Sequence, residues 1–139
     1  HNIDCSKNML YGEIPEEIYT HIGLGSLNLA HNGLFSGLSR NIGNLRNLYH
    51  LGLTGNTIAG HLPETICECR SLRWLRLQNC SMIGELPPNL GDLYNLTLLH
   101  LSGNNFTGSL PESLKKIPGL KKISCKGNRF DNDWTKENS

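Results

Sequence analysis

The chain has 139 residues, a net charge of +1 and a pI near 7.8, which suits one domain with one core. A charge so close to zero excludes a global field that would select nucleic acid or a membrane surface as partner. Its distribution is uneven, because residues 1–69 sum to −3 and residues 70–139 to +4. No apolar run approaches the ~18 residues of a membrane span, so we expect no membrane insertion.

A repeat of 24 residues runs through nearly the whole chain, without insertion or deletion. An apolar residue stands three and five positions before each aligned position, and from the second unit on leucine also stands eight before it. The aligned positions are Asn8, Asn32, Asn56, Cys80, Asn104 and Asn128. The pattern L-x-x-L-x-L-x-x-N/C therefore predicts units of about 1–23, 24–47, 48–71, 72–95, 96–119 and 120–139.

Each unit opens with a stretch in which inward and outward residues alternate, which predicts a strand with one buried face. In chain order, the inward pairs are Ile3/Cys5, Leu27/Leu29, Leu51/Leu53, Leu75/Leu77, Leu99/Leu101 and Ile123/Cys125. One such strand cannot bury its side chains alone, so the units should stack into a parallel sheet with strands about 4.8 Å apart. The Asn after each strand should turn inward and pair backbone groups whose burial would otherwise cost roughly 1–3 kcal/mol each.

The rest of each unit supplies the crossover that parallel strands require. Residues 10–15, 58–63, 82–87 and 106–111 share an apolar residue followed by x-G-x-I/L-P, where Gly permits a bend and Pro stops strand pairing. The second unit departs from this motif, because Gly37 comes one place late and Ser39 takes the proline position. Apolar pairs three apart, such as Ile42/Leu45, then predict a short helical or 3₁₀ turn.

The combined pattern resembles the plant-type leucine-rich-repeat family, found in plant receptor-kinase ectodomains, polygalacturonase-inhibiting proteins and some protist proteins. The resemblance covers residues 3 to about 130. It implies an α/β fold: one right-handed solenoid domain over residues 1–139, with a concave parallel β-sheet and short 3₁₀ or helical convex segments. We expect the tail, with Phe130 and Trp134, to cap the last unit. The first edge, with Ile3 and Leu10, should lie open, which would permit upstream repeats or self-association of two chains.

The five cysteines do not form a recognisable metal site. Four of them, Cys5, Cys69, Cys80 and Cys125, take places held elsewhere by inward leucines or by the strand-ending Asn. Cysteine is commonly buried as a small hydrophobe. Cys67 and Cys69 form C-x-C, which lacks both the C-x-x-C spacing and the second pair of a zinc site. We therefore expect no metal and no cofactor.

The cellular compartment has two interpretations. An odd number of mostly inward thiols favours a reducing compartment such as the cytoplasm. The family resemblance implies the cell exterior. N-x-S/T triplets at Asn79, Asn95 and Asn105 also point outside, although an Asn- and Thr-rich repeat generates such triplets freely.

Catalytic motifs are absent from the sequence, which contains no H-E-x-x-H, G-x-S-x-G, P-loop or dinucleotide fingerprint. We therefore expect a binding protein and not an enzyme, without catalytic residues. A basic run from Lys115 to Arg129 has two interpretations: a solvated edge, or a dock for an acidic partner or nucleic acid. Nucleic acid is disfavoured, because no aromatic residues interleave the run.

The concave face carries the candidate site, because the outward strand positions form columns across the sheet. One column contains His50, Trp74 and Leu98, and the next contains Arg76 and His100. Trp, Tyr and Arg most often carry interface energy. We expect a protein or peptide to bind through Asn28, His31, Tyr49, His50, Trp74, Arg76, Gln78, Leu98 and His100. The alternative is that Trp74 shields the sheet, or packs on Arg76, without any partner.

The family resemblance is compatible with three classes of function. The first is a protein-interaction module, alone or as the ligand-binding part of a larger receptor-like chain. The second is an enzyme inhibitor of the polygalacturonase-inhibitor type. The third is a receptor ectodomain that senses a small ligand or peptide, which would need a pocket and not an open groove.

Overall fold

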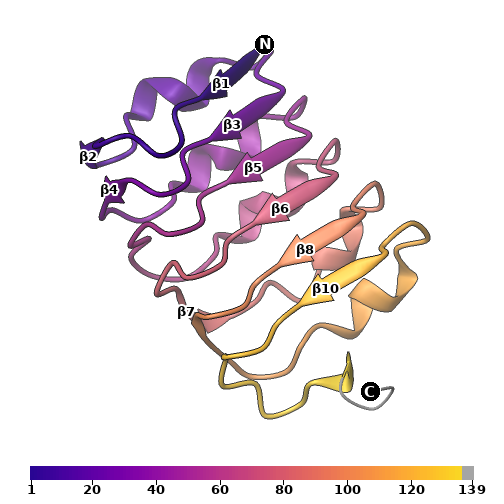
Figure 1. Cartoon of the computed structure of the whole chain (residues 1–139). Coiled ribbons are helices and arrows are strands. Elements are labelled where there is room, and N and C mark those ends of the chain that lie inside the picture. The colour runs from indigo at the N-terminus through magenta and orange to yellow at the C-terminus, as the bar shows by residue number, and fades with distance from the viewer. Residues whose placement is uncertain (136–139) are drawn as a thin grey trace.

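The computed structural model describes residues 1–135, and within them one strand per repeat joins a six-stranded parallel sheet (Figure 1). Neighbouring strands pair residues 24 apart, as His50 with Trp74 and Trp74 with Leu98, so the predicted register is confirmed. In spatial order the strands are β1 (Asn2–Asp4), β3 (Ser26–Asn28), β5 (His50–Gly52), β6 (Trp74–Arg76), β8 (Leu98–His100) and β10 (Lys122–Ser124).

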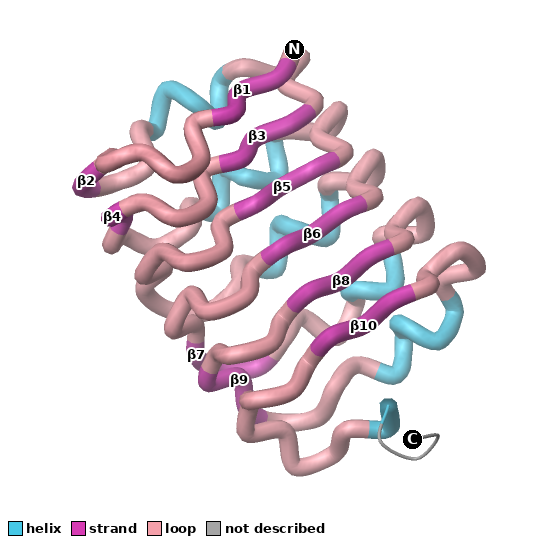
Figure 2. Tube along the Cα trace, in the orientation of Figure 1, coloured by secondary structure: helices cyan, strands magenta, loops and turns pink. Residues whose placement is uncertain are grey.

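Short 3₁₀ helices lie behind the main sheet and form the convex side (Figure 2). They are η1 (Glu16–Thr20), η2 (Arg40–Asn44), η3 (Glu64–Glu68), η4 (Leu90–Asp92) and η5 (Glu112–Lys116). Most of them follow a proline, which ends the preceding extended piece. In the second unit Ser39 replaces that proline and caps η2, since its Oγ accepts a hydrogen bond from the Asn41 N–H at 3.0 Å.

Accessory ladders lie beyond the main strands of some repeats, pairing β2 (Tyr11–Gly12) with β4 (Gly33–Leu34) and β7 (Ile83–Glu85) with β9 (Asn105–Thr107). The motif glycine at the bend has a positive φ where it holds its usual place, for example 87° at Gly60. Gly37, one place late, does not appear among the positive-φ residues of the described chain. The repeat pattern did not predict the pairing of these short strands.

The core lies between the main sheet and the 3₁₀ helices and consists mainly of leucine. Leu75 at the centre of β6 is 0% exposed, as its inward place predicts. Beside it runs the expected ladder of asparagines. Asn56 Nδ2 donates to the carbonyls of Leu53 and Leu29, at 2.9 and 2.8 Å, and thus joins its own unit to the previous one. Its Oδ1 accepts from the Leu34 N–H at 3.2 Å.

Cys80 replaces one asparagine of this ladder, and the backbone compensates for the missing amide oxygen. Its Sγ donates to the Leu53 carbonyl at 3.2 Å, where an amide would otherwise donate. An Asn at this position would accept a hydrogen bond from the Ile58 N–H with its side-chain oxygen. Here the Ile58 N–H donates to the backbone carbonyl of Cys80 at 2.9 Å. Ser81 has a φ of 58°, a conformation that residues following the ladder asparagines do not adopt within residues 1–135. The backbone groups around Cys80 therefore have hydrogen-bond partners, although a thiol is a weaker donor than an amide.

The two ends of the stack differ. Phe130 stacks on Phe106 with ring centroids 6.3 Å apart, and Trp134 Nε1 donates to the Leu110 carbonyl at 3.0 Å. Residues 136–139 of the proposed cap lie outside the described residues. At the other end β1 is an edge strand, and Met9 and Tyr11 nearby are exposed. Among the described residues no helix has the length and apolar character that crossing a bilayer would require.

Candidate functional site

The outward side chains of the main sheet form the surface that carries the candidate site, hereafter the sheet face. Figure 1 looks onto this face, with the 3₁₀ helices behind it. Strand alternation sends Leu75 into the core, while Trp74 and Arg76 on either side of it point away from the core. The same alternation on β5 and β8 brings His50, Leu98 and His100 to this face.

Trp74 is the central apolar group of the sheet face and is 36% exposed. Two rings hold it edge to face: Tyr49, with centroids 5.7 Å apart, and His50, at 6.0 Å. The Tyr49 hydroxyl in turn donates to Asn2 Oδ1 at 3.3 Å. On the opposite side Leu98 of β8 faces Trp74 in register and is half-buried. An aromatic side chain fixed on two sides loses little further entropy on binding, which suits an interface anchor.

His50 lies under this cluster, 9% exposed, and connects three strands. Arg76 Nη1 lies 3.3 Å from His50 Nε2, and because a guanidinium can only donate, Nε2 accepts. The proton is therefore assigned to Nδ1, which donates to Ser26 Oγ at 3.0 Å. Burial, and then the Arg76 charge, lower the pKa of His50, against a smaller opposing effect of Asp4. Neutral His50 thus holds the cation of Arg76 in place.

A second polar chain crosses the sheet face one column away. Thr54 Oγ1 donates to Gln78 Oε1 at 2.7 Å, and Gln78 Nε2 lies 2.6 Å from His100 Nδ1. His100 Nε2 is buried and has no hydrogen-bond partner among residues 1–135. Burial, then the charges of Lys122 and Arg76, lower the pKa of His100. These contacts stiffen β5, β6 and β8 where the aromatic cluster lies.

The structure thus brings together most of the residues that the sequence singled out, and separates His31 from them. Asn28 turns back on its own strand end, where its Oδ1 accepts from the Ala30 N–H at 3.1 Å. His31 has a φ of 56° and lies beyond the strand, with its ring against Gly55. His31 therefore belongs to the turn beside the sheet face, whereas Asn28 ends β3 opposite Gly52 of β5 and stays on that face. Asn2 and Arg73, which flank the aromatic and basic groups, were not singled out, although each stands just before or at the start of a strand in the 24-residue register. Lys121 belongs to the basic run that the sequence offered as a possible dock.

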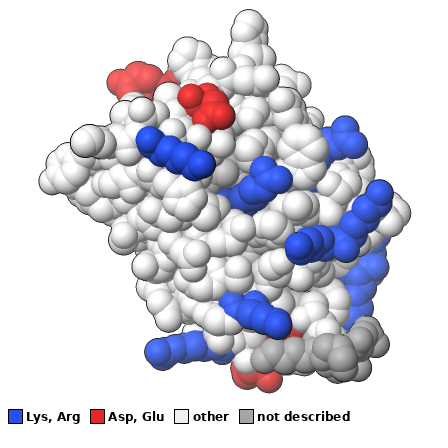
Figure 3. Space-filling model, in the orientation of Figure 1, with Lys and Arg blue, Asp and Glu red and all other residues white. Residues whose placement is uncertain are grey.

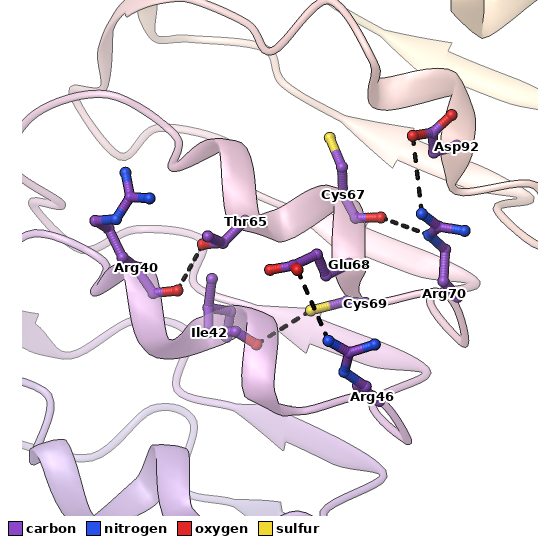
Figure 4. A network of polar contacts seen from close by, with 9 residues as sticks. All are labelled: Arg40, Ile42, Arg46, Thr65, Cys67, Glu68, Cys69, Arg70 and Asp92. Atoms are coloured by element: carbon purple, nitrogen blue, oxygen red, sulfur yellow. Dashed lines mark hydrogen bonds and ion pairs between the residues drawn. The ribbon is translucent and has the colours of Figure 1, made fainter.

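Charge on this side of the molecule is mainly positive. Figure 3, in the orientation of Figure 1, shows Lys and Arg spread over the face, with acidic groups towards the two ends of the stack. Arg76 has no carboxylate within ion-pair distance among the described residues. The ion pairs of residues 1–135 lie instead on the 3₁₀-helix side and the loops beside it, as Arg46 with Glu68 at 3.7 Å and Arg70 with Asp92 at 3.9 Å (Figure 4).

The thiols lie away from the sheet face. Cys69 Sγ donates to the Ile42 carbonyl at 3.2 Å inside the core, and Cys67 lies beside the Arg70–Asp92 pair (Figure 4). Burial raises the pKa of Cys67 to about 11, of Cys69 to about 12 and of Cys80 to about 11. Within residues 1–135 there is neither a disulfide nor a group of three or more ligand side chains suited to a metal ion. The geometry therefore directs attention to the sheet face.

Comparison with known proteins places the chain among repeat proteins. The family model described as Leucine Rich Repeat matches residues 71–93 and 95–117. A comparison with curated proteins finds no match. Among solved structures, a TDR receptor is 30% identical with a TM-score of 0.91, over 93% of this chain and 22% of that one. The Arabidopsis receptor kinase HAESA, solved with the peptide hormone IDA and the co-receptor SERK1, is 31% identical with a TM-score of 0.89, over 92% and 22% of the two chains.

A third similar structure is matched over most of its own length. A chain of the BIR3–SERK2 complex from Arabidopsis thaliana is 32% identical with a TM-score of 0.82, over 94% of this chain and 69% of that one. By contrast, the chain spans only 22% of the TDR and HAESA chains. From the 24-residue repeat, the parallel-sheet solenoid and these likenesses, the chain belongs to the leucine-rich-repeat family, in its plant-type class.

Proposed function

We propose that this chain binds a protein or peptide partner on the sheet face, with Trp74 as the apolar anchor and Arg76 as the adjacent polar contact. The observation that carries the proposal is the central, partly exposed Trp74, clamped by Tyr49 and His50 beside an Arg that has no carboxylate among residues 1–135. Clustered Trp, Tyr and Arg at the centre of a surface are the residues that most often dominate binding energy. A module that binds, and not an enzyme, is the function we assign.

The likenesses support a macromolecular partner. HAESA is solved with a peptide hormone and a co-receptor, and BIR3 with SERK2. We transfer to this chain only the class of partner, protein or peptide. An enzyme-inhibiting role, the alternative that the sequence left open, would use the same surface with an enzyme as the partner.

We further propose an extracellular setting, in line with the receptor likenesses. The inward thiols, which favoured a reducing compartment, do not oppose it. Cys67, Cys69 and Cys80 are buried and have raised pKa values, so they hold little of the thiolate that oxidation requires. Buried thiols can persist without a disulfide in an oxidising medium for that reason.

The test is a selection of random dodecapeptides displayed on phage against the immobilised protein, followed by affinity measurements with the enriched peptides. Trp74→Ala should weaken their binding by about 2 kcal/mol or more, roughly thirtyfold. The matched control is Tyr94→Ala, which removes an exposed aromatic ring outside the main sheet and should leave the affinities unchanged. Circular dichroism of both variants establishes that they are folded.

Two outcomes would contradict the proposal. If folded Trp74→Ala protein binds the selected peptides as tightly as the wild type does, the sheet face is not the binding surface. Loss of binding in Tyr94→Ala instead would move the site to the loops that precede the strands.

A further inference from the structure

The outward positions of the last four strands of the sheet face carry cations without anions. Within β5, β6, β8 and β10 and the two residues on either side of each, the charged residues are all Lys or Arg and none is Asp or Glu. They are Arg73, Arg76, Lys121, Lys122 and Lys126, hereafter the basic strip. Because the whole chain has a net charge of only +1, this concentration is a property of the face and not of the composition.

The cations of the basic strip are not neutralised within the described chain. None of them forms an ion pair with a carboxylate among residues 1–135, where the recorded pairs use Arg46, Arg70 and Lys115. Asp4 lies on β1, at the far edge of the sheet. Asp133 lines the hollow that Lys126 also lines, but its Oδ2 accepts from Cys125 Sγ at 3.3 Å. Like charges gathered on one face repel one another, and a bound anion would relieve that repulsion.

The arrangement also has an apolar component next to the cations. Leu98 stands in register between Trp74 on β6 and Lys122 on β10. Arg76 is held by neutral His50, so its remaining donors can serve a ligand. Strands about 4.8 Å apart place β6 and β10 roughly 10 Å from each other, the length of about three extended residues.

We propose that the ligand of the sheet face is an acidic peptide segment, with an apolar side chain over Trp74 and Leu98 and with carboxylates, about three residues farther on, over the lysines of the basic strip at β10. This inference rests on the proposed function and names its partner class. Carboxylates fit because Arg offers a planar fork of donors and Lys a mobile charge, and both gain from charge-assisted hydrogen bonds. The apolar step between them favours a peptide, which alternates apolar and anionic groups, over a uniformly charged polymer.

The experiment uses the peptides enriched in the phage selection. Asp and Glu should be overrepresented, relative to the unselected library, among the peptides whose binding requires Trp74. The charge reversal Lys122→Glu/Lys126→Glu, at two exposed positions, should weaken these peptides by about tenfold or more. The control Arg40→Glu/Lys116→Glu makes the same change of net charge on the convex helices η2 and η5 and should leave the affinity within about twofold.

Salt gives a second readout by fluorescence anisotropy of the labelled peptides. Raising the salt from about 0.1 M to 1 M shortens the Debye length from ~10 to ~3 Å and should weaken binding to the wild type more than to the charge-reversed protein. Heparin and single-stranded RNA serve as polyanion probes. Binding of either one, more tightly than the peptides and dependent on Lys122 and Lys126, would overturn the peptide assignment.

The two proposals fail separately. Peptides that require Trp74 but show no excess of Asp and Glu would refute the acidic ligand and leave the proposed function intact. Equal weakening by the convex control would refute it as well, because the effect would then be a net-charge effect. Binding that does not require Trp74 would refute the proposed function itself.

Discussion

Replacing Asn104 by Ala tests the internal asparagine ladder. Asn104 is 3% exposed, and its Oδ1 accepts from the N–H groups of Cys80 and Met82, both at 3.0 Å. Its Nδ2 donates to the Leu77 carbonyl at 2.7 Å and to the Leu101 carbonyl at 3.0 Å. The Leu101 carbonyl keeps a second donor from the next rung, so truncation leaves two N–H groups and one carbonyl without partners.

Each fully unsatisfied buried group costs roughly 1–3 kcal/mol, and water entering the vacated space recovers part of that cost. We therefore expect Asn104→Ala to lower the free energy of unfolding by about 3–5 kcal/mol. Asn8→Ala is the matched control, because Asn8 is exposed and water can replace its bonds to the carbonyls of Cys5 and Ser6. That variant should lose less than about 1 kcal/mol.

The assay is urea unfolding followed by circular dichroism, with the m-value checked for two-state behaviour. The expected result is a larger loss of unfolding free energy for the buried Asn104→Ala than for the exposed Asn8→Ala. Equal costs at both rungs, or a neutral Asn104→Ala, would show that the ladder hydrogen bonds are not what stabilises the stacked turns.

Further outcomes can be checked with the same methods. Cys80→Asn should change the stability by less than about 1 kcal/mol in urea melts, because Ile58 already donates to the Cys80 carbonyl; a large gain would show an unmet rung. Leu75→Ala should cost about 2–5 kcal/mol through a core cavity, whereas Trp74→Ala, which loses partly exposed ring contacts, should cost about 1–2 kcal/mol; the reverse order would mean that the strand faces are misread. The contribution of the buried thiols to stability should be complete below pH 9 and should be lost as the pH rises towards 11 and 12. The reason is that unfolded thiols ionise near 9.0, while burial raises the folded pKa values to about 11 for Cys67 and Cys80 and about 12 for Cys69. Thiol titration at pH 8 should accordingly find these sulfurs slow to react until denaturant is added, and fast native reaction would contradict their burial.

The interior could be predicted from the sequence because its periodicity is strict. A 24-residue repeat without insertions leaves a single register for parallel strands, and alternation within each strand then decides which side chain faces inward. Leu75 inside and Trp74 outside follow from that rule alone. The alternation also placed Arg76, Leu98 and His100 on the sheet face before any contact was known.

The repeat pattern could not predict the hydrogen bonds that compensate for departures from the consensus. Cys80 takes a ladder position in the sequence, but only the backbone path shows its carbonyl accepting a hydrogen bond from the Ile58 N–H. Likewise Ser39 takes the proline position in the sequence, and only the structure shows that its Oγ caps the following 3₁₀ helix. Both depend on local dihedral angles, which a consensus position does not specify.

The sequence by itself therefore determined the solenoid, the strand register and the set of outward residues, because periodic burial of leucine depends only on spacing. Tertiary structure alone decided how the outward residues act together. His50 lies beneath Trp74 and holds Arg76, and His31 lies in the bend beside the face. The flanking Arg73 and Lys121 join the basic strip. These relations depend on side-chain rotamers and on distances across strands, and residues 24 apart in sequence become neighbours only when the turns stack.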